Sequence, residues 1–279
     1  MTVLEVLNAA SGFLEKQGVE SPRLNAEHLL AHVLGKKKRI ELYLDFERPL
    51  GEEERAPLRE FVRQRAEGRP LQHLLGTVDF LGNLFSSDAR ALIPRPETEQ
   101  LVELVQNLTA IPDPRVLDVG TGSGVIALSL AMTSPLATVS ACDISTDALA
   151  LARENAVRHG LESRIFFHHA DLLSGLVGPF DVIVANLPYI PSDEIPGLSR
   201  EVRHDPAAAL DGGADGLVLI ARLIDTAPRV LAPGGLLALE IGVGQSGAVR
   251  ELLAGKNYRD IAAHPDYQKT ERFLIARHG

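Results

Sequence analysis

A glycine-rich loop is the first part of this chain whose residue types and spacing indicate ligand chemistry. Residues 118–124 read Asp-Val-Gly-Thr-Gly-Ser-Gly, with glycine at every second position from Gly120 onward. Glycine permits a tight turn and lets a ligand approach the backbone closely. The dinucleotide fingerprint G-x-G-x-x-G would need glycine where Val125 stands, and the Gly-Lys-Ser/Thr of a P-loop is absent. The loop therefore predicts a small-molecule site of another kind, with a glycine-rich turn that binds nothing as the alternative.

Acidic residues after the next two predicted strands favour a ligand. Asp143 follows 19 residues after Gly124, at the point where an acid in doubly wound folds accepts hydrogen bonds from a ribose diol. Its alternative role is to cap the following helix, but Ser145 and Thr146 offer caps of their own. Asp171-Leu172 follows the third strand and would reach the edge of an adenine ring. These strand ends are expected to line one crevice.

The segment Asn186-Leu187-Pro188-Tyr189 follows a fourth predicted strand, across the expected crevice from the glycine loop. It resembles the Asn-Pro-Pro-Tyr motif of enzymes that methylate exocyclic or amide nitrogens. Such a nitrogen is planar because its lone pair is delocalised, and two acceptors on its N–H groups favour pyramidalisation. The Asn186 side-chain oxygen and the Leu187 carbonyl would be these acceptors. Pro188 would fix the local backbone, and Tyr189 would pack against the planar group.

One position departs from that motif, because Leu187 stands where proline is usual. Leucine keeps the required carbonyl, so the proposed role survives. The same four residues also occur in the rRNA adenine dimethyltransferases, which keeps adenine open as an acceptor. A strand followed by a proline turn without chemistry is the remaining alternative.

Alternating strands and helices from residue 115 onward would position these side chains. Short apolar runs predict strands over 115–119, 137–142, 164–168, 181–185, 236–241, 258–263 and 272–276. Helical spacing predicts helices over 125–132, 147–159 and 217–231, and another that begins within 98–105. This alternation is typical of an α/β fold with a doubly wound sheet and crossover helices.

The chain before this sheet has a different character. Residues 1–75 show only helical spacing, which predicts a small all-α bundle, with Ser21 as the cap and Pro22 as the first residue of its second helix. Residues 76–93 contain Gly82-Asn83 between short apolar stretches, which predicts a β-hairpin connector. The expected domains are therefore 1–75, the connector 76–93, and the sheet domain 94–279.

Composition narrows the class of protein. The 279 residues carry a net charge of −9 and one cysteine, with no signal-peptide pattern and no apolar run long enough to span a membrane. We expect a cytoplasmic protein with no disulfide framework, no membrane association and no metal site. The acidic balance argues against stable nucleic-acid binding. The basic run 36–39 is interpreted as a solvated helix end, with a local nucleic-acid patch as the alternative.

Residues 95–279 resemble the methyltransferases with a Rossmann-like sheet of seven strands, the last inserted antiparallel. The resemblance implies S-adenosylmethionine as cofactor and S-adenosylhomocysteine as product. It implies that Gly120, Thr121, Gly122, Ser123 and Gly124 hold the methionine part and that Asp118 lies near its ammonium group. Asp143 would bind the ribose, Asp171 and Leu172 the adenine, and Asn186 would lie beside the cofactor.

Nearly the whole chain resembles the release-factor glutamine methyltransferases, the PrmC/HemK family. The similar stretches are 18–35, 68–76, 93–103 (which reads Ile-Pro-Arg-Pro-Glu-Thr-Glu at its start), 201–217 and 233–245. The family methylates the side-chain nitrogen N5 of the glutamine in the Gly-Gly-Gln loop of peptide chain release factors. The resemblance implies that residues 1–75 recognise this protein and that residues 186–189 bind its glutamine. Arg95 and Glu97 would shape the entrance, with a structural salt bridge as the alternative.

Two other functions stay open at this stage. One is methylation of adenine N6 in rRNA or DNA, which the Asn-Leu-Pro-Tyr spelling supports and the acidic charge opposes. The other is a non-catalytic module that keeps the fold only. The intact glycine loop, Asp143 and Asn186 oppose this second alternative. Within the family pattern, Leu172 and Leu81 replace residues that are often aromatic in relatives, which affects packing alone.

Overall fold

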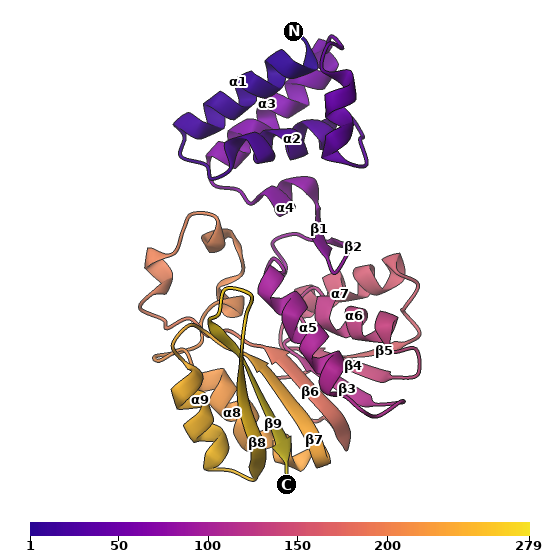
Figure 1. Ribbon diagram of the computed structural model, residues 1–279, viewed down its shortest axis with the longest axis vertical. Helices are drawn as coiled ribbons and strands as arrows, with labels where there is room; N and C mark the ends of the chain where they lie inside the picture. Colours follow the sequence, from indigo (N-terminus) through magenta and orange to yellow (C-terminus); the bar gives the residue numbers. More distant parts are fainter. The chain divides into compact units, whose positions relative to one another are not determined.

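In the computed structural model, which describes residues 1–279, the first helices pack on one another. They are α1 (Val3–Lys16), α2 (Pro22–Val33), the 3₁₀ segment η1 (Arg39–Asp45), α3 (Glu52–Ala66) and α4 (Leu71–Leu75) (Figure 1). Helix α1 begins at a capping box, in which the side chains of Thr2 and Glu5 each bond the other's backbone N–H. Apolar faces of α1, α2 and α3 share one buried core. The predicted helical bundle is confirmed.

The start of α2 differs from the prediction at one residue. Pro22 is the first helical residue, but Ser21 has a left-handed backbone with φ 47° and its side chain makes no capping hydrogen bond. In this conformation the hydroxyl does not face the free N–H groups of the first turn. The Asn25 side chain instead donates back to the carbonyls of Glu20 and Ser21, at 2.9 and 3.2 Å.

A short segment from far along the chain, Ser199–His204, belongs to the helical unit, which otherwise spans Met1–Thr77. Buried Arg65 of α3 joins the two parts: its Nε donates to Asn25 Oδ1 at 2.7 Å and its Nη2 to Glu201 Oε2 at 2.6 Å. The predicted domain boundaries, at residues 75 and 94, did not assign Ser199–His204 to the helical unit. The second unit therefore comprises Val78–Leu198 and Asp205–Gly279.

The predicted hairpin is present as β1 (Thr77–Phe80) and β2 (Asn83–Ser86). Its turn residues Leu81 and Gly82 both have positive φ, at 50° and 73°, as a two-residue hairpin turn requires. Phe80 and Phe85 are buried in the core of the second unit and contact each other edge to face, with centroids 6.2 Å apart. The hairpin therefore packs as part of the sheet unit.

The second unit is built on a seven-stranded sheet in the order β5-β4-β3-β6-β7-β9-β8. Its strands are β3 (Arg115–Val119), β4 (Thr138–Asp143), β5 (Ile165–His169), β6 (Phe180–Asn186), β7 (Leu231–Glu240), β8 (Tyr258–Pro265) and β9 (Glu271–His278). Strands β3 to β7 pair in parallel, and β9 is inserted antiparallel between β7 and β8. The doubly wound prediction, with its inserted last strand, is confirmed.

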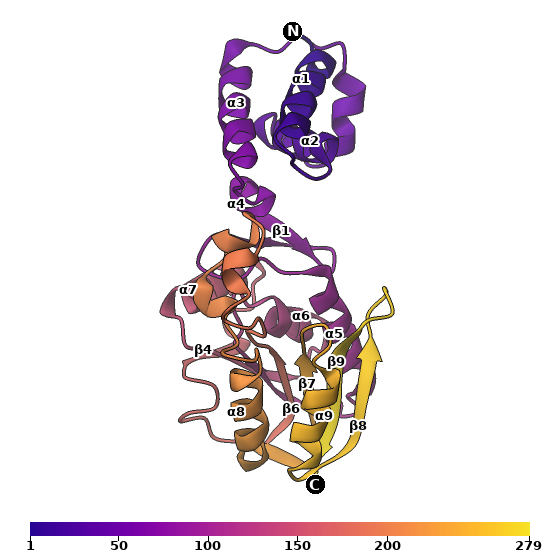
Figure 2. The same ribbon diagram turned by 90° about the vertical axis from the view of Figure 1, so that its left-hand side faces the viewer.

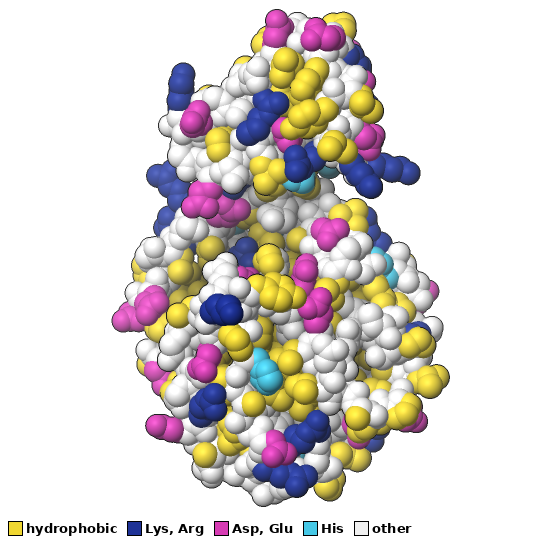
Figure 3. Space-filling model, in the orientation of Figure 1, with side chains coloured by type: hydrophobic (Ala, Val, Ile, Leu, Met, Phe, Trp, Pro, Cys, Tyr) yellow, Lys and Arg dark blue, Asp and Glu magenta, His cyan; other side chains and the backbone are white.

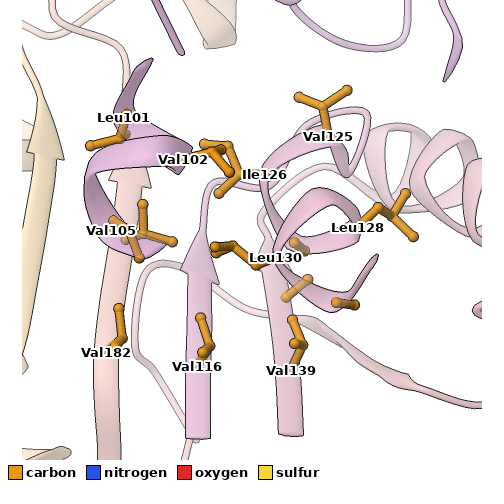
Figure 4. Packing of buried hydrophobic residues seen from close by; sticks show 14 of the residues in the cluster. Leu101, Val102, Val105, Val116, Val125, Ile126, Leu128, Leu130, Val139 and Val182 are labelled. Atoms are coloured by element: carbon orange, nitrogen blue, oxygen red, sulfur yellow. The ribbon is translucent and has the colours of Figure 1, made fainter. Parts of the chain in front are cut away.

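Helices cover both faces of this sheet (Figure 1, Figure 2). One face carries α5 (Pro96–Leu108), α6 (Val125–Thr133) and α7 (Thr146–Arg158), and the other carries α8 (Val218–Thr226) and α9 (Ser246–Ala254). On the first face, Val105 of α5 points toward the strand residue Val182, and Val102 of α5 lies beside Ile126 of α6 in the same buried cluster (Figure 4). None of the helices has the length and hydropathy that crossing a membrane requires.

Two predicted elements differ from those observed. The helix expected over 217–231 ends at Thr226, because Pro228 lies in a separate 3₁₀ turn, Ala227–Arg229. Strand β7 then begins at Leu231, five residues earlier than predicted, and its pairing with β6 shifts register across the Pro-Gly-Gly segment. Helix α9 was not predicted at all; its buried positions include only Val249 and Leu253 as large apolar residues.

Candidate active site

A cavity of about 460 Å³ opens at the carboxyl ends of β3, β4 and β6, where ligands bind in folds of this topology. Most residues predicted for the site line it, namely Arg95, Gly120, Thr121, Gly122, Ser123, Asp143, Asp171, Leu172, Asn186, Leu187 and Pro188. Four predicted residues do not line it: Glu97, Asp118, Gly124 and Tyr189. The structure thus brings the three strand-end motifs together around one space.

The glycine loop is shaped by bonds to the neighbouring strand. The N–H groups of Gly120 and Thr121 both donate to the Cys142 carbonyl of β4, at 2.9 and 3.0 Å. Gly120 has φ 72°, and a Cβ built there would lie 2.9 Å from Leu187 Cδ2. Gly124 has φ 85°, and its Cβ would lie 3.1 Å from Ala152 Cβ of α7. Only glycine fits both positions without displacing a neighbour.

Asp118 lies beneath this loop and is fully buried. Its Oδ2 accepts from Thr121 Oγ1 at 2.6 Å and from the Ala127 N–H at 3.2 Å. Burial raises its pKa to about 7, although these two hydrogen bonds lower the pKa in part. Its other oxygen, Oδ1, has no hydrogen-bond partner in the protein. A buried acceptor without a donor suits a ligand that carries N–H groups.

Asp143, the last residue of β4, is held by two backbone donors. The Gly122 N–H donates to Oδ2 and the Ser145 N–H to Oδ1, both at 2.9 Å. Ser145 caps α7 by accepting from the Ala148 N–H at 3.1 Å, so Asp143 is not the helix cap. An ionised carboxylate has further lone pairs, and these remain available on the cavity side.

Asp171 and Leu172 line the wall that follows β5. Asp171 Oδ2 accepts from Arg222 Nη2 of α8 at 2.8 Å, and both side chains are about half exposed. Leu172 has a positive φ of 50°, and its carbonyl accepts from the Cys142 thiol at 3.3 Å. The carboxylate thus has an ion-pair partner that sequence reasoning did not identify.

Asn186 ends β6 and is oriented from within the sheet unit. Its Nδ2 donates to Thr98 Oγ1 of α5 at 3.0 Å, and Thr98 Oγ1 donates to Glu240 Oε2 of β7 at 2.7 Å. Thr98 and Glu240 are buried, with exposed fractions of 3% and 1%. Neither residue was predicted for the site, although both fall within the stretches similar to the family.

Tyr189 does not line the cavity, contrary to the expectation that it packs against the substrate there. Its hydroxyl accepts from Arg272 Nη2 at 3.0 Å, and the guanidinium lies over its ring, 5.3 Å from the centroid. Its carbonyl accepts from Gln245 Nε2 at 2.9 Å. Burial raises the pKa of the phenol, with a further contribution from Glu240. In this structure Tyr189 therefore stabilises the turn after Pro188 through its contacts with Arg272 and Gln245.

Arg95 and Glu97 do not form the pair that was one interpretation of them. Arg95 Nη2 binds Asp205 Oδ2 at 2.8 Å, and the Ile93 N–H donates to Asp205 Oδ1 at 3.2 Å. Asp205 is buried and lies 110 residues from Arg95 in sequence, so only the fold reveals the pair. Glu97 lies off the cavity wall. No cluster of three or more His, Cys, Asp or Glu side chains is placed to hold a metal ion.

The sheet order, the glycine loop and the strand-end acceptor motif together define a Rossmann-like, S-adenosylmethionine-dependent methyltransferase. Comparisons with known proteins give the family. Residues 5–76 match the model of the PrmC N-terminal domain, and residues 98–201 match the methyltransferase small domain. A release factor glutamine methyltransferase of Chlorobaculum tepidum is 42% identical over 285 residues, which cover 98% of this chain and 96% of that protein.

A second relative of the same name, from Deinococcus radiodurans, is 42% identical over 278 residues and covers 99% of both chains. The chain therefore belongs to the release factor glutamine methyltransferase family. Among solved structures, the hMettl16 catalytic domain superposes with a TM-score of 0.61 at 16% identity, covering 77% of this chain and 81% of that one. At this identity the likeness shows the fold alone.

Proposed function

We propose that this chain transfers the methyl group of S-adenosylmethionine to the side-chain nitrogen N5 of the glutamine in the Gly-Gly-Gln loop of peptide chain release factors. The observation that carries the proposal is the orientation of the Asn186 amide. Its Nδ2 donates to Thr98 Oγ1, so its Oδ1 is the atom left to accept a hydrogen bond at the cavity wall. An acceptor at this point suits a substrate that presents N–H groups.

Residues on the cavity wall and beneath it suit each part of S-adenosylmethionine, which supplies an electrophilic methyl group on a sulfonium. Asp118 lies beneath the glycine loop and not on the wall, and its Oδ1 is a buried acceptor without a partner that suits the ammonium group. Asp143 suits the two ribose hydroxyls. Asp171 and Leu172 would contact the adenine, with an aliphatic side chain against the ring. Backbone groups of residues 120–124, with Thr121 and Ser123 on the wall, would hold the methionine part.

Two acceptors would grip the substrate amide, Asn186 Oδ1 and the Leu187 carbonyl. Together they fix the direction of the nitrogen lone pair and oppose its delocalisation into the carbonyl group. Methyl transfer from a sulfonium is an in-line displacement, so positioning supplies much of the rate. The S–C bond breaks as the N–C bond forms, and the surplus proton leaves the nitrogen after transfer. The reaction therefore needs no strong general base.

The helical unit, Met1–Thr77 with Ser199–His204, is proposed to recognise the release factor. On the side of each unit that Figure 3 shows, Lys and Arg side chains are interspersed with Asp and Glu side chains. Together with a net charge of −9, this favours a protein partner over extended nucleic acid. Because release factors act at ribosomes, the proposal also implies action in the cytoplasm.

Incubation with labelled S-adenosylmethionine tests this function. The enzyme is incubated in parallel with a release factor and with purified rRNA, and any labelled site is mapped by mass spectrometry. We expect label on the loop glutamine, none on a factor whose loop glutamine is replaced by alanine, and none on the rRNA. Label on adenine of the RNA, with none on the factor, would overturn the proposal and favour the adenine alternative.

A truncated protein tests the role of the helical unit. Residues 78–279 retain the hairpin that packs into the sheet core, so they should still bind S-adenosylmethionine. Methylation of an intact release factor should fall to a small fraction of the full-length rate. Full activity of the truncated protein on the intact factor would refute the recognition role without touching the assignment of the reaction.

A further inference from the structure

The ends of two adjacent strands place two polar side chains on the same face of the sheet. Asn186 and Glu240 are register partners in the parallel pair β6–β7, and each is the last residue of its strand. Side chains alternate between faces, and Val184 and Ala238, two residues earlier, belong to the core beneath α5 and α6. Asn186 and Glu240 therefore both point toward the first turn of α5, where Thr98 lies.

The hydrogen bonds among these three residues have a fixed direction. An ionised carboxylate can only accept, so the Thr98 hydroxyl must donate to Glu240 Oε2. A hydroxyl carries one hydrogen, so Thr98 Oγ1 can only accept from its second neighbour, Asn186. The group that faces Thr98 is therefore the NH₂ of Asn186, and the carbonyl oxygen of the amide must point the other way.

We infer that Glu240, acting through Thr98, is a positioning residue that sets the Asn186 amide with its oxygen toward the acceptor nitrogen. This inference rests on the proposed function, because it explains how the enzyme selects a substrate that donates N–H bonds. In the reversed amide, Asn186 would present NH₂ to the NH₂ of the substrate, and two donors would oppose each other. The relay thus excludes the unproductive orientation before the substrate binds.

The surroundings of Glu240 fit this role better than that of a structural ion pair. Its Oε1 has no hydrogen-bond partner, and the nearest cation, Arg272 Nη2 of β9, lies 3.8 Å away and is engaged by Tyr189. A carboxylate buried only for stability would be expected to have both oxygens bonded, because an unbonded buried acceptor costs free energy. The well-formed contact is the one toward Thr98 and Asn186.

The relay also predicts how activity changes with pH. Burial raises the pKa of Glu240 to about 7, the charge of Glu97 raises it further, and the Thr98 hydrogen bond, the charge of Arg272 and the nearby Asn186 side chain lower it. Tyr189 stays neutral beside it, because its own pKa is raised. Only the ionised carboxylate forces Thr98 to donate, so kcat should rise with pH through about 7.

Three substitutions test the relay. Thr98→Val keeps the shape but loses the hydroxyl, and kcat on the release factor should fall about 10- to 100-fold, the scale for partners that orient a ligating side chain. The KM for S-adenosylmethionine should change less than about twofold. Thr98→Ser restores the hydroxyl and should recover most of the rate. Glu240→Gln should lower kcat and remove its rise near pH 7.

Thr133→Val is the matched control, because its hydroxyl donates to Ser129 O within α6 and accepts from Gln106 Nε2 of α5, and neither Thr133 nor Gln106 lines the cavity. It should keep the kcat of the unaltered enzyme. If folded Thr98→Val, judged by its melting temperature, keeps that kcat, or if Thr98→Ser is as impaired as Thr98→Val, the relay is wrong. Absence of glutamine labelling by the unaltered enzyme would instead overturn the proposed function itself, and the relay with it.

Discussion

Gly120 and Leu187 lie against each other, so that the glycine loop of β3 and the acceptor motif of β6 form one packed surface. A Cβ at Gly120 would come within 2.9 Å of Leu187 Cδ2 and nothing else within 4 Å. Leu187 is itself buried in the core on the α8 side of the sheet. A leucine in place of the usual proline of the motif thus has a physical role here: its side chain determines how closely the two motifs approach.

Gly120→Ala should therefore damage both motifs at once. The left-handed backbone and the contact with Leu187 should together lower the free energy of unfolding by about 1–3 kcal/mol and weaken S-adenosylmethionine binding. Gly244→Ala is the matched control, because its φ is 82° but no atom lies within 4 Å of its Cβ. In chemical denaturation, Gly120→Ala with Leu187→Ala should cost less than the sum of the two single changes. Additive losses would show that the contact has no energetic role.

Asp143→Ala should weaken S-adenosylmethionine binding by about 1–3 kcal/mol, the usual loss for hydrogen bonds to a charged group. The loss has two parts, because the carboxylate would bind the ribose and also holds the Gly122 N–H at 2.9 Å. Asp147→Ala removes an acid from the same helix end that is exposed and off the cavity wall, so it controls for charge alone. Calorimetry measures both affinities. Equal affinity for Asp143→Ala and the unaltered protein would rule out the ribose assignment.

Much of this fold could be predicted because buried parallel strands are short apolar runs with clear ends. The strand expected at 115–119 is β3 without change, and the hairpin expected around Gly82-Asn83 is β1–β2, with its turn one residue earlier at Leu81-Gly82. Helix α9 was missed because its buried stripe begins with a polar residue, Ser246. The helix expected over 217–231 was too long because periodicity alone does not show where a 3₁₀ turn replaces the α-helix.

The candidate site was predictable where its residues form local motifs or follow directly after predicted strands. The glycine loop and residues 186–189 are local motifs that resemble those of known methyltransferases, and Asp143 and Asp171 follow the ends of predicted strands and line the cavity. Thr98 is 88 residues from Asn186 and 142 from Glu240, and Asp205 is 110 from Arg95. No local pattern connects such residues, because their contact depends on how α5 and the β6–α8 connection pack on the sheet. Tyr189 lies in a motif that the sequence does reveal, but the sequence does not show that its side chain points away from the cavity.

The stability of the protein should depend on pH through Asp118. Burial raises the pKa of this carboxyl to about 7, from about 3.8 in an unfolded chain. Between these values the folded state binds more protons than the unfolded state, so this residue's contribution to stability falls as pH rises. In Asp118→Asn an amide that does not ionise replaces the carboxyl, so the stability of the variant does not have this dependence on pH. The difference in unfolding free energy between the variant and the unaltered protein should therefore increase from pH 4 to pH 8 in urea titrations without ligand.

Asp225→Asn provides the control for this titration. Its carboxylate is exposed and has a pKa lowered by Lys256, so it stays ionised across the same range. The difference in unfolding free energy between Asp225→Asn and the unaltered protein should stay constant from pH 5 to pH 8. A difference for Asp118→Asn that is equally flat would mean that Asp118 is ionised in the folded protein throughout, and its burial would then need a cation that offsets the charge.

Asn186 is the residue on which the proposed reaction depends most. Asn186→Ala should leave S-adenosylmethionine affinity nearly intact, because the other cavity contacts come from the ends of β3, β4 and β5. Turnover on the release factor should fall by at least about a hundredfold, the scale seen when one preorganised polar partner is removed.

Asn186→Asp tests the direction of the amide more directly. It keeps an acceptor toward the substrate but has no NH₂ to give Thr98, so an anion would face the Thr98–Glu240 pair. We expect its turnover to fall as far as that of Asn186→Ala at pH 8 and to recover in part at pH 6, where protonation of either carboxyl restores a donor. Single-turnover kinetics with saturating cofactor measure both. Turnover of Asn186→Asp equal to that of the unaltered enzyme at pH 8 would show that the direction of the amide does not matter, and Asn186 would then serve only as a spacer at the end of β6.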